Sequence, residues 1–191
     1  MQVETLAIAG PLLITPKRFS DDRGFFSETY AQRVLEPHGI GAAFVQDNHS
    51  LSRLPGVLRG LHYQLPPKAQ GKLVRVVRGS IFDVAVDIRR GSPDYGRHVS
   101  TVLSADNWRQ LWVPVGFAHG FLTLEPDTEV IYKVTADYAP DLDRGIAWDD
   151  PDVAVAWPLA GGTPPTLSAK DQGQPRFADL QSPFSLRAQA G

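Results

Sequence analysis

The sequence predicts an all-β protein built as a β-sandwich or barrel. Short runs of β-branched and aromatic residues recur through the middle of the chain, and Gly, Pro and Asp separate them. Helical periodicity is scarce. The 191 residues, 42% of them hydrophobic, are enough to build the core of one domain. The jelly roll is one architecture of this kind, and we expect only short peripheral helices beside it.

The first element expected in chain order is a short helix over residues 28–36 (ETYAQRVLE), which Pro37 should end. The next are two strands, KLVRVVR (72–78) and IFDVAVDI (81–88), and the Gly79-Ser80 pair between them predicts a hairpin. Alternation in the second strand predicts an apolar face of Phe82, Val84, Val86 and Ile88, with Asp83, Ala85 and Asp87 on the other face.

Four further strands are expected, at HVSTVLS (98–104), RQLWVPV (109–115), GFLTLE (120–125) and TEVIYKVT (128–135). The last two should be joined by a turn at Glu125-Pro126-Asp127-Thr128, where Pro fits the second position. After about residue 159 the composition shifts to Gly, Pro, Ser and Gln, which indicates a loop-rich tail draped over the domain. We therefore expect one domain over 1–185 and a frayed end at 186–191.

The composition excludes several classes of function. A net charge of −2 argues against general nucleic-acid binding, which usually shows a strong basic excess. Cysteine is absent, so a disulfide framework, a thiol nucleophile and a thiolate metal site are all excluded. No stretch has the apolar length of a transmembrane helix, and MQVETLAIAGPLLI lacks the features of a secretory signal. We expect a cytoplasmic protein that does not act at a membrane.

His62 and Lys72 are the first candidates for chemistry. If residues 60–64 form a strand, His62 lies on the same side as Gln64, facing either a polar interior or solvent. A histidine inside a barrel could transfer protons near neutral pH, whereas on the surface it would be structural. Lys72 shares the side of Val74 and Val76. It could stabilise negative charge on an oxygen, or it could be a solvated lysine at the start of a strand.

Three other residues have both a functional and an ordinary interpretation. Tyr132 lies on the same face as Val130 and Val134, and it is either a core tyrosine or a proton donor that reaches the same cavity as His62. Tyr138 is either a packing residue or a flat surface on which a base can stack. Asp171 is either a solvated loop residue or a carboxylate that orients a histidine, and spacing alone cannot connect it with His62.

Polar residues in three other segments are weaker signals. They are Arg23, Glu28, Gln46, Asn48 and Arg59. Arginines would suit the phosphates of a sugar nucleotide, because a guanidinium group matches phosphate oxygens. The sequence contains neither GxGxxG nor a Walker motif, so a dinucleotide or ATP fold is not indicated.

Taken together, these segments resemble the dTDP-4-dehydrorhamnose 3,5-epimerase family. The matching segments occur in order over roughly residues 3 to 171: PKRFSDDRGFFSETY, FVQDNHSLS, GVLRGLHYQ, QGKLVRVVRGSIFDVAVDIR, WVPVGFAHGF, VIYKVTADYAP, DRGIAWDDP and LSAKD. Eight ordered segments are far more specific than one motif. The resemblance implies a cupin-type jelly-roll barrel, a homodimer with sites near the subunit interface, and neither metal nor organic cofactor.

The resemblance also implies roles for individual residues. His62 matches the base that removes a proton beside the C4 ketone, and Asp171 the carboxylate paired with it. Lys72 matches the cation near the enolate oxygen, and Tyr132 the acid on the opposite face. Tyr138 matches the position that stacks on thymine. The remaining matches are substrate contacts, some of which cross to the partner's site in the family: Arg23, Glu28, Gln46, Asn48, Arg59, His119, Asp143 and Lys170. The position of Asp143 often carries Glu in relatives, so the arm is shorter here.

The expected activity is inversion of C3 and C5 of dTDP-4-keto-6-deoxyglucose, a step of rhamnose-type deoxysugar biosynthesis. A mono-epimerase acting at C3 or C5 only, as in antibiotic deoxysugar biosynthesis, is the main alternative. A metal-dependent cupin enzyme fits less well, because His62 is followed by Gln64 and no Glu occurs between Glu36 and Glu125. A non-catalytic sugar-nucleotide binding module is also less favoured, because binding alone needs no opposed acid and base.

Overall fold

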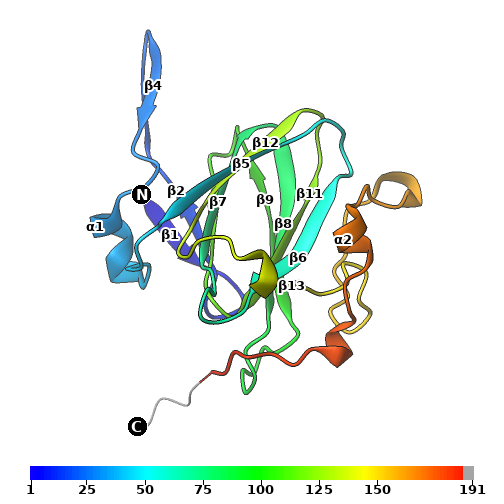
Figure 1. Ribbon diagram of the computed structural model, residues 1–191. Coiled ribbons are helices and arrows are strands. Elements are labelled where there is room, and N and C mark those ends of the chain that lie inside the picture. The colour runs from blue at the N-terminus through cyan, green and yellow to red at the C-terminus, as the bar shows by residue number, and fades with distance from the viewer. Residues whose placement is uncertain (187–191) are drawn as a thin grey trace.

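The computed structural model describes residues 1–186, and in that part of the chain two large antiparallel sheets face each other (Figure 1). The six-stranded sheet has the order β1 (Gln2–Thr5), β2 (Leu12–Thr15), β10 (Gln110–Val113), β7 (Lys72–Arg78), β12 (Thr128–Val134) and β5 (Gln46–Ser52). The five-stranded sheet has the order β13 (Asp143–Gly145), β6 (Leu58–Gln64), β11 (Phe117–Thr123), β8 (Ser80–Asp87) and β9 (His98–Ser104). A separate hairpin of β3 (Arg18–Asp21) and β4 (Gly24–Ser27) projects from the body (Figure 1). The predicted all-β jelly roll is confirmed.

Helices are short and peripheral, as predicted. They are α1 (Gln32–Leu35), α2 (Ala169–Gln172) and the 3₁₀ turns η1 (Glu36–His38), η2 (Pro140–Leu142), η3 (Ala160–Gly162) and η4 (Phe177–Asp179). The predicted helix over 28–36 begins too early, because α1 starts at Gln32. It ends at Leu35, before Pro37, as expected, and the 3₁₀ turn η1 then continues through Pro37, which is tolerated in a first turn. The chain turns away at Gly39, which adopts a left-handed conformation with φ 84°. Within residues 1–186, no helix is long and apolar enough to cross a membrane.

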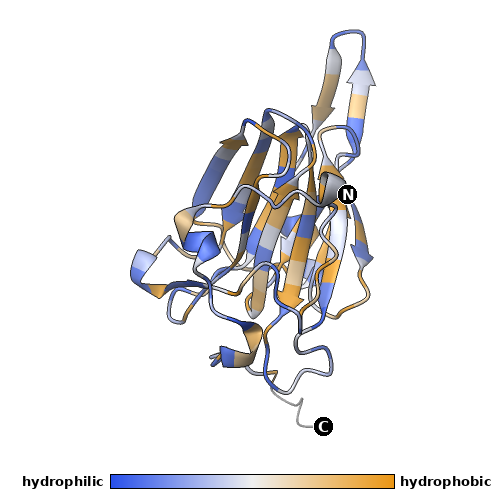
Figure 2. Ribbon diagram, turned by 90° about the vertical axis from the view of Figure 1, so that its right-hand side faces the viewer, coloured by the Kyte–Doolittle hydropathy of each residue, from blue (hydrophilic) through white to orange (hydrophobic). Residues whose placement is uncertain are grey.

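The main core fills the space between the two large sheets. Val74 and Val76 of β7 and Val130 of β12 meet Ile81 and Ala85 of β8 in one cluster. Residues two apart on a strand point to the same side, so the alternation of each strand delivers these side chains inward. Figure 2 shows the result as hydrophobic colour concentrated along the central strands.

A second core covers the outer face of the five-stranded sheet. Val84 and Val86 of β8 and Leu61 of β6 pack there with Val153 and Phe184 from the C-terminal segment. That segment includes α2 and runs, in orange and red, along the side of the domain next to β6 in Figure 1, draped as expected. Leu186 N–H donates to the Arg90 carbonyl at 2.9 Å, and the rest of the tail predicted over 186–191 lies outside the described residues.

Both faces of β8 are therefore buried, so the polar residues that alternate with its apolar ones do not mark a solvent-exposed face. Phe82, Val84, Val86 and Ile88 do share one face, as predicted, and Ile81 and Ala85 lie on the other. Asp83 and Asp87, on the face with Ala85, have exposed fractions of 0%. The polar face of this strand points into the protein rather than to solvent.

The predicted hairpin between β7 and β8 was wrong. β7 pairs with β10 and β12, whereas β8 pairs with β9 and β11, so Gly79 leads the chain from one sheet to the other. Gly79 has φ +73°, and a Cβ there would lie 2.4 Å from Thr128 Oγ1. This close approach and positive φ explain the glycine without a hairpin. The predicted turn at 125–128 is confirmed, with Asp127 in the left-handed region at φ 49°, and it too connects the two sheets.

Candidate active site

A polar cavity of about 230 Å³ opens between the two large sheets. Its lining consists of Ser50, Arg59, His62, Lys72, His119, Phe121, Tyr132, Ser168, Lys170 and Asp171. A smaller cavity of about 90 Å³ shares His62, Lys72 and Tyr132 with it and adds Gln46, Asn48, Tyr63, Gln64, Gln70, Tyr138 and Asp143. The two spaces therefore adjoin at His62, Lys72 and Tyr132.

The structure brings together all but two of the residues that the sequence singled out. The exceptions are Arg23 and Glu28, which line neither cavity. Arg23 is exposed at the turn of the β3–β4 hairpin, where its guanidinium and backbone N–H both bond to Asp21. Glu28 is exposed beyond the hairpin and pairs with Arg33 at 3.2 Å.

His62 is placed by the pairing of β6 with β11. His62 and His119 are directly opposed residues on these strands. The register shifts just after His119, where Gly60 and Gly120 allow the two backbones to come very close. A Cβ at Gly60 would lie 2.5 Å from the Gly120 Cα, which no larger residue could accept without movement. The two glycines thus set the spacing of the two histidines.

A carboxylate orients His62. His62 Nε2 lies 2.5 Å from Asp171 Oδ1, and because an ionised carboxylate only accepts, Nε2 carries the hydrogen and Nδ1 is left as the basic nitrogen. Asp171 is only 4% exposed and lies in α2, not in the loop that the sequence suggested. Ser168, the N-cap of α2, donates its hydroxyl to Asp171 Oδ2 at 2.8 Å and accepts the Asp171 N–H at 3.1 Å.

The environment of Asp171 favours its ionised form. Burial alone would raise its pKa, but the hydrogen bond and charge of His62, the hydroxyl of Ser168 and the charge of Lys170 together lower the pKa below its ordinary value. A carboxylate that stays ionised and is bonded on both oxygens fixes the tautomer of His62, so that Nδ1 is available to accept a proton.

Lys72 and Tyr132 stand on the opposite wall, in the six-stranded sheet. Their strands are neighbours, with Lys72 paired to Val134 and Tyr132 to Val74. Burial lowers the pKa of Lys72 to about 8, a shift that the charges of Asp143 and Asp83 partly offset. Burial raises the pKa of Tyr132, so its phenol is protonated at neutral pH. The Lys72 ammonium lies 3.5 Å from the His62 carbonyl oxygen. The surface interpretation of this lysine is wrong.

The outer cavity is framed by a hydrogen-bonded group. Tyr138 is 55% exposed, and its hydroxyl donates to Asp143 Oδ2 at 3.1 Å, while Lys170 Nζ donates to the same oxygen. Gln46 accepts the Tyr138 N–H at 3.0 Å and donates to Asn48 Oδ1 at 2.8 Å. An exposed aromatic ring beside amide groups and a lysine is suited to hold a base and a phosphate.

Sequence reasoning missed one polar residue that lines the cavity, Ser50, and one that lies behind it, Asp83. Asp83 has an exposed fraction of 0%, and its Oδ1 accepts from His119 Nε2 at 2.8 Å. Ser50 alternates with Gln46 and Asn48 on β5, and this alternation could have identified it. Asp83 could have been found only by recognising that both faces of β8 are buried.

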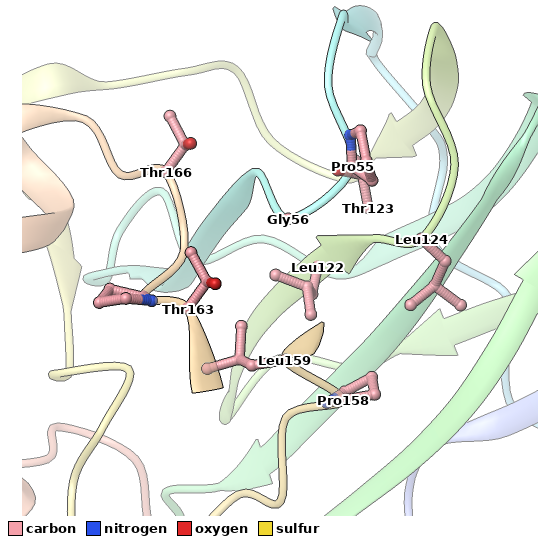
Figure 3. Close-up of a pocket in the computed structure, with 10 residues that line it drawn as sticks. Pro55, Gly56, Leu122, Thr123, Leu124, Pro158, Leu159, Thr163 and Thr166 are labelled. Atoms are coloured by element: carbon pink, nitrogen blue, oxygen red, sulfur yellow. The ribbon is translucent and has the colours of Figure 1, made fainter. Parts of the chain in front are cut away.

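A further cavity, of about 320 Å³, lies where the end of β11 meets the chain around Pro158 and Leu159 (Figure 3). Its lining consists of Pro55, Gly56, Leu122, Thr123, Leu124, Pro158, Leu159, Thr163, Pro164 and Thr166. None of these side chains titrates near neutral pH, so they supply no acid or base. The polar cavity is the one with the groups that proton transfer requires.

The fold and the polar cavity define a jelly-roll protein whose cavity is equipped for acid–base chemistry. A histidine with its orienting carboxylate stands on one side of the cavity, and a lysine and an un-ionised phenol stand on the other. Within residues 1–186 no group of three or more His, Cys, Asp or Glu side chains is placed to hold a metal ion.

Comparison with known proteins gives the family. Residues 5–179 match the family model described as dTDP-4-dehydrorhamnose 3,5-epimerase, and this chain belongs to that family. An enzyme of that name from Sinorhizobium fredii is 51% identical over 184 residues, which are 96% of this chain and 93% of the relative. Another from Pseudomonas aeruginosa is 52% identical over 180 residues, 94% of this chain and 97% of the relative.

A solved structure of a related epimerase has the same fold as this chain. The crystal structure of a dTDP-6-deoxy-D-glucose-3,5-epimerase from Legionella pneumophila, in complex with dTDP-4-keto-L-rhamnose, superposes with a TM-score of 0.90. It is 45% identical, and the match covers 99% of both chains.

Proposed function

We propose that this protein is a dTDP-4-dehydrorhamnose 3,5-epimerase, which inverts C3 and C5 of dTDP-4-keto-6-deoxyglucose. Relatives that carry this name share 51% and 52% sequence identity with this chain over nearly its full length. The observation that supports it best is that His62 faces one cavity with Lys72 and Tyr132 from the opposite sheet, while Asp171 of α2 bonds to His62 in the same cavity. The cytoplasmic location expected from the sequence stays a prediction.

The proposed chemistry follows from the acidity of a carbon beside a ketone. Removing its proton is feasible only when the resulting negative charge reaches the ketone oxygen, so a base and an oxyanion stabiliser must act together. His62 takes the proton, Asp171 stabilises the imidazolium that forms, and the Lys72 ammonium stands at the C4 oxygen. Inversion needs the proton to return from the other face, and Tyr132, on the opposite wall, is the group placed to return it.

The nucleotide occupies the outer cavity in this proposal. Tyr138 stacks on the thymine ring, and Gln46, Asn48 and Asp143 supply hydrogen bonds. Arg59 and Lys170 bind the diphosphate, because cations match phosphate oxygens. His119 contacts the sugar, and nothing in this scheme uses a metal or an organic cofactor.

The experiment is an NMR time course of the purified protein with dTDP-4-keto-6-deoxyglucose in D₂O. A 3,5-epimerase places deuterium at both C3 and C5 and yields the product inverted at both. Inversion at one carbon only would replace the proposal with a mono-epimerase. Binding without any exchange would replace it with a binding module.

We also propose that the active form is a homodimer in which the β3–β4 hairpin reaches the partner's cavity. Phe19, Phe25 and Phe26 on this hairpin are 54%, 54% and 71% exposed, and such exposed apolar surface on a projecting element favours a protein partner. Arg23 at its tip would then contribute to the partner's site, which would account for its position outside the cavity of its own chain.

Subunit mixing tests the dimer. Arg23→Ala and His62→Ala proteins, each weakly active, are unfolded, mixed in equal amounts and refolded. If Arg23 acts in the partner's site, half of the dimers are mixed and carry one intact site, so about a quarter of wild-type activity returns. No recovery in mixtures that contain mixed dimers would contradict the proposal.

A further inference from the structure

Asp83 is a buried carboxylate behind the active site. Its exposed fraction is 0%, and it lines neither cavity, so it does not contact a bound sugar. Oδ1 accepts from His119 Nε2 at 2.8 Å, whereas Oδ2 has no hydrogen-bond partner in the described part of the chain. Fully buried carboxylates that leave an oxygen unpartnered are rare in folded proteins, and each calls for an explanation.

We propose that Asp83 is a positioning residue for the epimerase: it orients the His119 ring toward the sugar and supplies negative charge that keeps Lys72 an ammonium. The proposal rests on the proposed function. It gives a role to a residue that does not touch substrate.

The strand register supports the orienting role. On β11 and β8, His119 pairs with Ala85 and Phe121 pairs with Asp83, so Asp83 and His119 are diagonal neighbours on one face. Because a carboxylate only accepts, the bond places the hydrogen of the His119 ring on Nε2. Nδ1 is then the nitrogen left to bind a sugar oxygen, and the rotation of the ring is fixed beside His62.

The charges around Lys72 support the second role. The titratable and charged groups around it come from six elements, β6, β8, β11, β12, β13 and α2, and from the loop that holds Tyr138: Arg59, His62, Asp83, His119, Tyr132, Tyr138, Asp143, Lys170 and Asp171. Among the charges, Asp143 and Asp83 raise the pKa of Lys72, while Lys170 lowers it. Asp143 already holds Lys170 and the Tyr138 hydroxyl. Asp83 has an unpartnered oxygen in a fully buried place, where charge acts with little screening.

Asp83→Asn is the test, because it keeps the shape and the Oδ1 acceptor but removes the charge. Steady-state kinetics are measured from pH 5.5 to 9.5 with dTDP-4-keto-6-deoxyglucose. We expect kcat to fall about 10- to 100-fold, as for other supporting residues behind an active group, with KM within about threefold. The basic limb of the kcat/KM profile should move to lower pH, because Lys72 loses its proton more readily.

Asp87→Asn is the matched control. Asp87 lies on the same strand and face with the same exposed fraction of 0%, but it is bonded to Arg89 and Ser92 outside the cavities. We expect this variant to lose stability and to keep the wild-type basic limb. An unchanged kcat and basic limb in Asp83→Asn, or an equal movement in Asp87→Asn, would overturn the proposal.

A second variant covers the case in which Asp83→Asn does not fold. Asp83→Glu keeps the charge but displaces it by one methylene, so kcat should fall while the basic limb stays near its wild-type position. Wild-type kcat in that variant would refute the orienting role. Failure of the wild-type protein itself to turn over the substrate would refute the proposed function instead.

Discussion

Replacing Lys72 with Met should make the protein more stable and nearly inactive. The stem of Lys72 shares the inward face of β7 with Val74 and Val76, and Met keeps an unbranched apolar chain of similar length there. The substitution removes only the ammonium, and with it the free-energy cost of desolvating that charge in the folded protein. Loss of a fixed cation at a developing oxyanion should lower kcat by about 10²- to 10³-fold.

The size of the stability gain follows from the pKa. Burial lowers the pKa of Lys72 from 10.5 to about 8. At about 1.4 kcal/mol for each tenfold change in proton affinity, full burial would cost the folded state about 3 kcal/mol at neutral pH. The side chain is partly exposed, and solvent reduces this value. We therefore expect Lys72→Met to raise the free energy of unfolding by about 1–3 kcal/mol at pH 7.

The stability gain of Lys72→Met over wild type should decrease as the pH rises. Between pH 8 and 10.5 the unfolded chain holds the Lys72 proton more tightly than the folded protein, so wild-type stability rises with pH across this window. Below pH 8 both states are charged and the destabilisation is fully present; above 10.5 it disappears. The difference between Lys72→Met and wild type should therefore shrink steadily from pH 8 to 10.5.

Urea unfolding at several pH values and one protein concentration measures the difference. Lys68→Met is the control, because the Lys68 ammonium is paired with Asp137 at the surface, where an ion pair contributes little to stability. If Lys72→Met is no more stable than wild type at pH 7, or if the difference does not change between pH 8 and 10, the account of this lysine is wrong.

The remaining predictions concern other parts of the site. Asp171→Asn should lower kcat by about 10²- to 10⁴-fold, since His62 loses its orienting charge, and a loss of less than twofold in steady-state kinetics would contradict this role. Gly120→Ala should lower the melting temperature and kcat, because its Cβ would meet the Arg59 carbonyl oxygen at 2.9 Å; Gly41→Ala, with its nearest contact at 3.5 Å, should change neither. Prolonged treatment with EDTA should leave turnover unchanged, and a loss that added metal restores would favour a metal-dependent enzyme.

Strand identity could be predicted from the sequence because it depends on local alternation. The strands at 72–78 and 98–104 have the predicted ends, and the inward face shared by Tyr132, Val130 and Val134 followed from parity alone. Sheet membership could not be predicted in the same way. The Gly79-Ser80 connection has the composition of a hairpin, but whether the chain folds back or crosses to the other sheet depends on distant packing, here against Thr128.

In the site, too, strand alternation predicted which side chains face inward, whereas contacts between residues far apart in the sequence could not be predicted from it. Parity indicated that His62, Lys72 and Tyr132 could face one interior, and they line one cavity. The pairing of His62 with Asp171 spans 109 residues and depends on how the C-terminal segment crosses the five-stranded sheet, so only the family resemblance supplied it. Asp83 was assigned to a polar face because alternation cannot tell a buried polar face from a solvated one.

The central claim is that His62 and Tyr132 act on one sugar ring from its two faces. Deuterium content and product configuration, measured together by NMR for wild type, His62→Ala and Tyr132→Phe in D₂O, test it most directly. His62→Ala should neither exchange nor invert, whereas Tyr132→Phe should lose much more inversion than exchange. Wild-type exchange in His62→Ala, or an equal loss of exchange and inversion in Tyr132→Phe, would contradict the claim.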